Sequence, residues 1–531
     1  MTREGLTTLD WAVIVGYGVV MVLMGIYYAR RQRSSQDFFV GGRSLNSTAV
    51  GISLLATLLS TISYLATPGE MIAKGPVIGL GVLASPIVYF VVGYWLLPVI
   101  MRHQITSAYE LLESKLGLGV RLLAASMFLA LRLTWMGVMI SVASVAVVGL
   151  LALSDEQAEW AVPLTVFLCG ILAVGYTALG GLKAVVTTDV VQFILLFSGA
   201  LLTIAMVTWE SGGFSWFPTE WEPHWQSQPI FSWDPTVRVT WFGTILGGAL
   251  YWVCTAGSDQ TAIQRFMATG SQQAARRSFL VNIIADVSTM AMLALVGLAV
   301  LGFYRQQSGD TGLDLVGQGD QLFPRFIATQ LPPGVAGLVV AAMFAAVMSS
   351  LDSGLNSAAS VIITDFIRRF SGRQPTDAEG LRLSRNLTLA MGFVIIALAM
   401  LVQHVPGNIL EMSQRTLNLL VAPLFAIFFL AFFVRFATPF GAVFGTWYGC
   451  TVAFLISFWD AVTGGPILSF QWIAPCALLV SIAVGVSLSL VPVQKSNRKP
   501  LCVLAGLPVA ACNMWIVWQF AQRLIGSVSS G

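Results

Sequence analysis

The chain has 531 residues, of which 56% are hydrophobic and 10% are charged, with a formal net charge of +3. Soluble globular domains carry about 25% charged residues, so this composition excludes a soluble protein and indicates one that crosses a membrane many times. The 28 Lys and Arg against 25 Asp and Glu are too evenly balanced for a nucleic-acid-binding protein. We therefore expect the lipid bilayer as a partner and no nucleic acid; the oligomeric state stays open.

Apolar runs long enough to cross a bilayer, about 20 residues each, follow one another along the chain. The run that begins at Trp11 has no basic region before it and no small-residue cleavage motif, so we expect a retained span. The pattern predicts an all-α membrane protein with about 14 transmembrane helices, near residues 10–29, 47–74, 76–100, 121–150, 161–179, 184–209, 238–257, 277–303, 334–366, 384–403, 408–434, 438–459, 470–491 and 500–521.

The basic residues of the connections predict the orientation. With the N-terminus outside, the inner connections hold 20 Lys and Arg, Arg265 among them, and the outer ones hold 7. An even number of spans then puts both termini outside the plasma (inner) membrane. Arg132 is the one basic residue left inside a span.

Two predicted spans lose their apolar character part-way. The second has Ser60, Thr61 and Ser63 in its middle, and the seventh turns polar over residues 255–260. Non-helical backbone at membrane depth is tolerated where it lines a cavity, and its freed carbonyls can bind ions. Because these spans lie five apart, we expect two inverted five-helix repeats at 38–209 and 238–434, between an N-terminal extra helix at 1–37 and accessory helices at 435–531.

The ninth span carries a polar stripe within the sequence AAVMSSLDSGLNS, residues 345–357. Ser349, Asp352, Ser353 and Asn356 follow i, i+3, i+4, i+7 spacing and share one helical face. Such oxygens suit a partly dehydrated alkali cation, because hard cations prefer oxygen ligands. The alternative is structural, since serines in membrane helices also bond the carbonyl one turn back or a neighbouring helix.

Four segments, Phe38–Glu70, Tyr176–Gln192, Ser258–Ala268 and Met348–Arg369, resemble in order the characteristic segments of the sodium:solute symporter family. The resemblance implies a LeuT-type core of ten helices, with one extra helix before it and three after it. It also implies Na⁺ as the coupling ion. Carried over residue by residue, it implies a sodium site built from the carbonyls of Ala56, Leu59 and Ala346 and the hydroxyls of Ser349 and Ser350.

Some relatives hold a second cation, and here that site would use Asp189 with Ser350, Asp352 and Ser353. Asp352 stands where relatives of that kind have a serine, and its carboxylate could strengthen the site or carry a proton. An alternative for Asp189 is a helix N-terminal acid that interacts with the dipole.

The candidate solute pocket consists of Leu58, Ser60, Ser63, Trp252 and Thr255. Three of these differ from the Gln, Asn and Tyr of similar sugar carriers, which disfavours galactose-like sugars. Arg132 resembles the arginine that acid-carrying relatives place against a solute carboxylate, a group that a guanidinium meets with two hydrogen bonds. The alternative for Arg132 is an ion pair or carbonyl cluster that holds helices together.

These residues predict a sodium-coupled symporter that imports a small organic solute by alternating access, with a slight preference for a carboxylate such as sialic acid or a monocarboxylate. A sugar symporter or a proton-coupled one is the alternative within this fold. A membrane-embedded enzyme is disfavoured, because His103, His224 and His404 fall at loops or span ends and no HExxH, GxSxG or paired Cys motif occurs. The asymmetry of a single chain with broken helices disfavours a channel.

Overall fold

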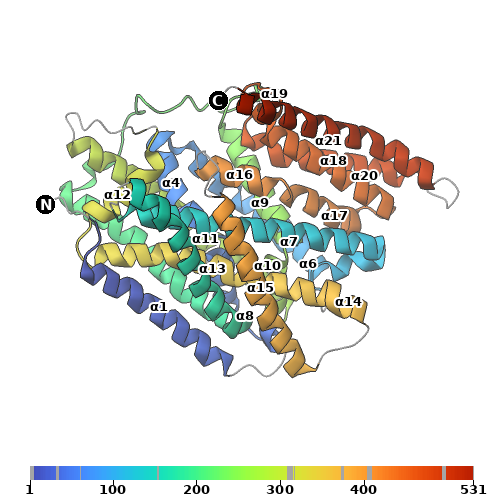
Figure 1. Cartoon of the computed structure of the whole chain (residues 1–531), viewed down its shortest axis with the longest axis horizontal. Helices are drawn as coiled ribbons and strands as arrows, with labels where there is room; N and C mark the ends of the chain where they lie inside the picture. The colour runs from blue at the N-terminus through green and yellow to red at the C-terminus, as the bar shows by residue number, and fades with distance from the viewer. Residues whose placement is uncertain are drawn as a thin grey trace. The chain divides into compact units, whose positions relative to one another are not determined.

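A computed structural model describes residues 5–30, 35–59, 61–103, 105–151, 155–307, 315, 317–371, 376–402, 409–492 and 498–529 (Figure 1). Ser60 and His404 lie outside the described residues. Every regular element within them is helical, which confirms the predicted all-α class. The chain forms two compact units, unit 1 from Met1–Ser85, Arg132–Ser227 and Gln264–Ser413, and unit 2 from Pro86–Leu131, Gln228–Ile263 and Gln414–Gly531.

Unit 1 contains α1 (Thr8–Ala29), α2 (Ser35–Val40), α3 (Ser47–Leu58), α4 (Thr61–Ala73), α8 (Asp155–Glu210), α11 (Gln272–Gln307), α12 (Gly319–Thr329), α13 (Val335–Val361), α14 (Arg368–Ser371) and α15 (Asp377–Val402). Unit 2 contains α6 (Leu97–Ile100), α9 (Trp241–Ser258), α17 (Val421–Phe433), α18 (Pro439–Ser457), α19 (Trp459–Thr463), α20 (Ile473–Ser489) and α21 (Arg498–Ser529). Four helices run from one unit into the other: α5 (Ser85–Phe90), α7 (Glu110–Gly149), α10 (Gln260–Ala268) and α16 (Ile409–Asn418). Short 3₁₀ or π-helical turns are η1 (Gly41–Arg43), η2 (Pro76–Ala84), η3 (Val91–Leu96), η4 (Phe214–Trp216), η5 (Ile362–Ile367) and η6 (Phe470–Trp472).

Eleven helices of the described chain are long and apolar enough to cross a bilayer, and the α3–α4 pair, bent by 65°, makes a twelfth. The spans expected near 161–179 and 238–257 fall on the first part of α8 and on α9, which are not among these twelve. A count of 14 therefore stays a prediction, as do the repeat boundaries.

Both predicted helix breaks are present. α3 ends at Leu58, and Leu59 is extended with ψ 105° before α4 begins at Thr61. α9 ends at Ser258, and Asp259 is extended with ψ 123° before α10. The polar residues that interrupt these apolar runs therefore mark the places where the backbone leaves the helix.

A third break lies inside α8 at Gly181, where φ is 59° and ψ is 179°. Residues with a side chain rarely adopt this positive φ, so a glycine is required. The corner separates the fifth and sixth predicted spans. It also starts the helical segment that carries Asp189.

The extra N-terminal helix α1 is hydrogen-bonded to the start of α13. The Asp10 carboxylate accepts hydrogen bonds from the backbone N–H of Gly334 and of Gly337, both at 2.8 Å. Its second oxygen accepts from the Thr7 backbone N–H at 2.8 Å. Asp10 therefore caps α13 from another helix, and it is fully buried.

The loop between α8 and α9 packs partly on unit 1. Trp225 donates its indole N–H to the Ile72 carbonyl at 3.0 Å, and His224 contacts the same oxygen at 2.8 Å. Trp216 is 2% exposed, whereas Trp233 is 81% exposed. Trp225 therefore packs on the end of α4, whereas the buried Trp216 packs against α11 at Gly302 and donates its indole N–H to Thr208 at 3.0 Å.

The C-terminal helices α18 and α20 lie side by side in unit 2 (Figure 1). Small residues line their contact. A Cβ atom at Gly445 would lie 2.5 Å from the Ser481 carbonyl oxygen, and one at Gly441 would lie 2.4 Å from that of Gly485. Small residues at four-residue spacing let two membrane helices approach closely, where van der Waals contacts hold them.

Candidate functional site

The break between α3 and α4 is held against the middle of α13. Ser350 donates its hydroxyl to the Thr57 carbonyl at 2.8 Å, just before the break. Thr61, just after it, donates to the Met343 carbonyl at 3.0 Å. Ala346 lies on α13 between these two contacts, so the break and the serine-rich stretch stand at the same level of unit 1.

The five predicted sodium ligands meet at this level. Ala56 and Leu59 belong to the end of α3, and Ala346, Ser349 and Ser350 belong to α13; all are exposed by 3% or less. Carbonyls in the last turn of a helix lack the N–H partner of a following turn, so they can bind a cation.

The hydrogen bonds of the two serines suit this role. Ser350 donates to Thr57, as above, and Ser349 donates to the Asp189 carboxylate at 2.5 Å. Each hydroxyl thus donates its hydrogen to another acceptor, so the lone pairs of its oxygen can bind a cation. The donor set, neutral oxygens with one carboxylate behind them, fits sodium.

Asp189 is the centre of a buried network. Its carboxylate accepts from Ser349, from Ser53 and from the Arg265 guanidinium, the last at 3.2 Å. Arg265 also donates to Ser53 at 2.9 Å and to Ser353. Ser353 in turn lies 2.7 Å from the Thr57 hydroxyl. Helices α3, α8, α10 and α13 are thereby joined around one ion pair.

Arg265 corrects one sequence-based assignment. It counted among the basic residues of the inner connections, but its side chain is 0% exposed and paired with the equally buried Asp189. A buried charge needs a partner of opposite sign, and Asp189 provides it. The residue is therefore part of the core, and the expected inner basic residues fall from 20 to 19.

The residues predicted for a second cation are divided among different partners. Ser350 and Ser353 contact Thr57, whereas Asp352 accepts a hydrogen bond from Thr177 of α8. A second cation at Asp189 would also meet the positive charge of Arg265. The Asp189 site stays a prediction, with this ion pair weighing against it.

The predicted solute residues fall in both units. Leu58, Ser63 and Arg132 belong to unit 1, whereas Trp252 and Thr255 belong to unit 2. Arg132 is 4% exposed, as expected for a cation within a span. It lies one turn before Met136, whose sulfur would be 2.5 Å from a Cβ at Gly354 of α13. Arg132 is therefore one turn from the point where α7 touches the serine-rich helix.

A second polar cluster connects the C-terminal half of α13 to α10. The Gln264 amide of α10 donates to the Phe39 carbonyl at 2.5 Å and to Asn356 at 2.9 Å. Its carbonyl oxygen accepts from Ser357 at 2.7 Å. Every polar atom of this buried side chain has a partner, which indicates a structural role.

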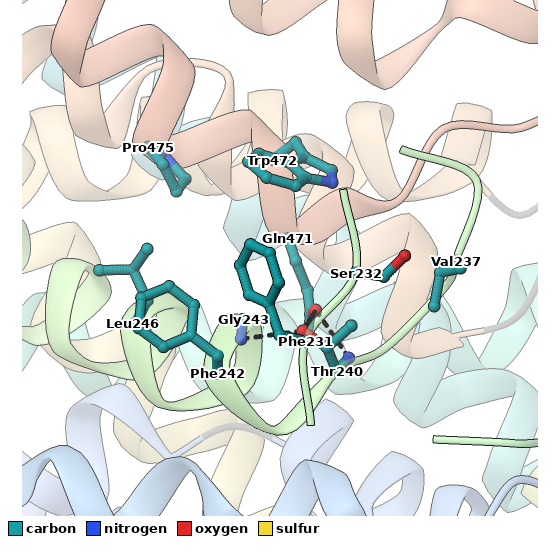
Figure 2. Close-up of a pocket in the computed structure, with 10 residues that line it drawn as sticks. All are labelled: Phe231, Ser232, Val237, Thr240, Phe242, Gly243, Leu246, Gln471, Trp472 and Pro475. Atoms are coloured by element: carbon teal, nitrogen blue, oxygen red, sulfur yellow. Dashed lines mark hydrogen bonds between the residues drawn. The ribbon is translucent and has the colours of Figure 1, made fainter. Parts of the chain in front are cut away.

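Unit 2 has an aromatic pocket where α9 and α20 begin. Figure 2 shows Phe231, Phe242 and Trp472 around it, with Gln471 accepting a hydrogen bond from the Thr240 N–H at 3.0 Å. The residues that line it do not include the predicted solute residues. We therefore do not assign it to the solute.

Comparison with known proteins decides the family. Residues 38–449 match the sodium:solute symporter family. The chain belongs to this family. Sodium:solute symporters are membrane transporters, so an integral membrane protein coupled to Na⁺ is established here, and the resemblance of the four sequence segments is confirmed.

Individual symporters are similar over most of their length. The chain is 29% identical to a sodium/sialic acid symporter of Proteus mirabilis over 79% of this chain and 84% of that protein. It is 29% identical to sodium-coupled monocarboxylate transporter 1 of Xenopus laevis over 80% of this chain and 67% of that protein. A solved structure of a Na⁺-coupled sialic acid symporter, substrate-bound and outward-open, superposes with a TM-score of 0.77 at 25% identity, over 92% of this chain and 99% of that one. This likeness confirms the symporter fold.

Sequence reasoning missed Ser53, Thr57 and Arg265 as members of the polar network. Ser53 and Thr57 lie one turn apart near the end of α3, so they share the face of this helix that meets α13. Arg265 lies inside the segment Ser258–Ala268 that carries the family resemblance. That position, together with the need of the buried Asp189 for a partner, was the available signal.

Proposed function

We propose that this sodium:solute symporter carries Na⁺ at the break of α3 and imports a small solute with it, and that the solute bears a carboxylate. The observation that carries this proposal is the placement of Ser349 and Ser350 against the end of α3, with their hydrogens already donated. Sodium would tie α3 to α13 and raise the affinity for solute before both are released inside.

Arg132 supports the preference for an acid. It is buried within a membrane helix one turn from the contact of α7 with α13. A guanidinium there matches a carboxylate, and the names of the similar proteins include carriers of sialic acid and of monocarboxylates. The finer identification of the solute rests on this residue.

The membrane potential favours this direction of transport. Each uncompensated positive charge that moves inward gains about 2.3 kcal/mol per 100 mV. An anionic solute that travels with a single sodium ion loses this gain, so such a carrier profits from a second cation.

Thermal shift tests the proposal. Purified protein is melted with sugars, sialic acids, amino acids and monocarboxylates, each in sodium and in potassium chloride, because a ligand of the native state raises the Tm. We expect a carboxylate solute to raise the Tm only in sodium. Ser349→Ala should abolish the sodium dependence of the solute-induced shift, and Arg132→Ala should abolish the solute-induced shift alone.

A sodium-independent shift, unchanged in Ser349→Ala, would contradict the proposal and favour proton coupling. A shift produced by sugars and indifferent to Arg132 would contradict the preference for an acid.

We also propose that both termini lie outside the plasma (inner) membrane, as the basic residues suggest. Single cysteines placed near each terminus of a variant without the native cysteines should react with an impermeant maleimide in intact cells. Protection of either terminus until the cells are broken would reverse its placement.

A further inference from the structure

Helix α11 carries two buried polar residues that the site described above does not use. Asn282 is 0% exposed and Asp286 is 6% exposed. They lie four residues apart, so their side chains project from the same face of the helix. On the other side of α11, Ile284 is 58% exposed and Leu295 is 38% exposed, which marks the face toward lipid. Asn282 and Asp286 therefore face the protein.

Two close contacts fix how α11 lies along the broken span. A Cβ at Gly51 of α3 would lie 2.4 Å from the Ser278 carbonyl oxygen, and a Cβ at Gly297 would lie 2.6 Å from the carbonyl oxygen of Pro68 in α4. Asn282 and Asp286 lie between Ser278 and Gly297, just as the break lies between Gly51 and Pro68. The two helices thus run side by side in the same direction.

Helix geometry puts Asp286 level with the break. Asp286 lies eight residues beyond Ser278, about 12 Å along the axis, and Leu58 lies seven residues beyond Gly51, about 10 Å. The break is where α3 ends and its last carbonyls lose their helical partners. The last turn of α3, residues 55–58, covers about 6–10 Å on the same scale, and Asn282 lies about 6 Å along α11. The amide therefore lies beside the start of this turn and the carboxylate beside its end.

The Asn282 side chain is the informative group beside this turn. Neither its amide oxygen nor its amide nitrogen has a hydrogen-bond partner within the part of the chain that the structure describes. Buried amides are nearly always paired, because an unpaired one destabilises the fold. A membrane interior makes this cost harder to avoid, since water is scarce there. The group is best explained as half of a ligand site.

We propose that Asn282 and Asp286 form a second sodium site, on the side of the broken span that faces α11. The ligands would be the Asn282 amide oxygen, the Asp286 carboxylate and carbonyls freed at the end of α3. All are hard oxygen acceptors, and one carboxylate balances one monovalent charge. Asp189 pairs with the Arg265 guanidinium, so a cation at that carboxylate would meet a positive charge. The inference rests on the proposed sodium coupling and extends it to a second ion.

Equilibrium binding of ²²Na⁺ to the purified full-length protein tests this without knowledge of the solute. We expect two sodium ions per wild-type protein, one in Asp286→Asn and one in Asn282→Leu. Ser349→Ala should also retain one, and Asp286→Asn combined with Ser349→Ala should retain none. Ser288→Ala, on the lipid face of the same helix, is the matched control and should retain two.

The outcomes separate the two proposals. One ion in the wild type, kept by Asp286→Asn and Asn282→Leu and lost in Ser349→Ala, overturns the α11 site and leaves the proposed function intact. No sodium in the wild type overturns both. If Asp286→Asn and Asn282→Leu keep two ions and instead weaken solute binding, these residues contact the solute and the cation site is wrong.

Discussion

Gln264 on α10 and Asn282 on α11 are both buried amides in unit 1, and their surroundings are opposite. Gln264 donates to Phe39 and Asn356 and accepts from Ser357, so its amide is saturated. Asn282 has no hydrogen-bond partner within the described chain. The difference teaches that burial alone does not identify a ligand site. A saturated polar group is part of the framework, and an unsatisfied one indicates what the framework is built to receive.

The most severe test of the saturated framework is Arg265→Met. It leaves the Asp189 carboxylate buried without its counter-charge, which should destabilise the protein by about 3–5 kcal/mol. The loss would be measured by unfolding in detergent. Adding Asp189→Asn to Arg265→Met should restore part of it, because no buried charge is then left unpaired. A single substitution tolerated at less than about 1 kcal/mol would mean that the ion pair is not a structural element.

Gln264→Leu should have the next largest effect. It removes the Gln264 partner of the Phe39 carbonyl, the Asn356 Oδ1 and the Ser357 hydroxyl, at an expected cost of about 2–4 kcal/mol. Gln264→Glu keeps the acceptor for Ser357 and serves as the partial control. A change in Tm no larger than that of an exposed substitution such as Ser288→Ala would remove Gln264 from the framework.

Asp10→Ala tests a saturated group far from the break in the sequence. Loss of a capping carboxylate costs about 1–2 kcal/mol, and here the cap spans two helices. The Tm should fall and α1 should become more accessible to protease. Asp10→Asn, which keeps one acceptor oxygen, should lose less.

Asn282→Leu should change the stability least of the four substitutions, and it should raise the stability instead of lowering it. Replacing an unpaired buried amide with an apolar side chain of similar size removes its desolvation cost, so stability in potassium should rise by about 1 kcal/mol. The same variant should gain less Tm from sodium than the wild type does. A loss of stability like that of Gln264→Leu would show that Asn282 is satisfied and would end the comparison.

Much of the fold could be predicted from the sequence, because apolar length and polar interruption are local properties. The break at Leu59 lies directly before the polar residues Ser60, Thr61 and Ser63. The break at Asp259 falls within the polar run that ends the seventh predicted span. The sequence also indicates Ser349 and Ser350 as site residues, because hydroxyl groups in an apolar membrane helix destabilise it unless they bind an ion or a hydrogen-bond partner.

The remainder depended on which helices meet. Hydropathy assigns any arginine near a span end to a connection, so it wrongly places Arg265 in a loop. The pairing of Arg265 with Asp189 depends on which helices pack together, and hydropathy does not encode this. Asn282 and Asp286 are isolated polar residues in an apolar run. Their relation to the break rests on the contact of Gly51 with Ser278, and no periodicity encodes that contact.

Because Asp10 caps α13, the first helix α1 contributes to the structure of the helix that carries the sodium-site serines. α13 carries the serine pair, and its first turn depends on a carboxylate more than 320 positions earlier in the chain. A shortened version that begins at the family-matched residue 38 would therefore expose unpaired N–H groups at the start of the very helix it was meant to preserve. For anyone trimming this protein for crystallisation or fusing a reporter to its front end, the usable boundary lies before Thr7.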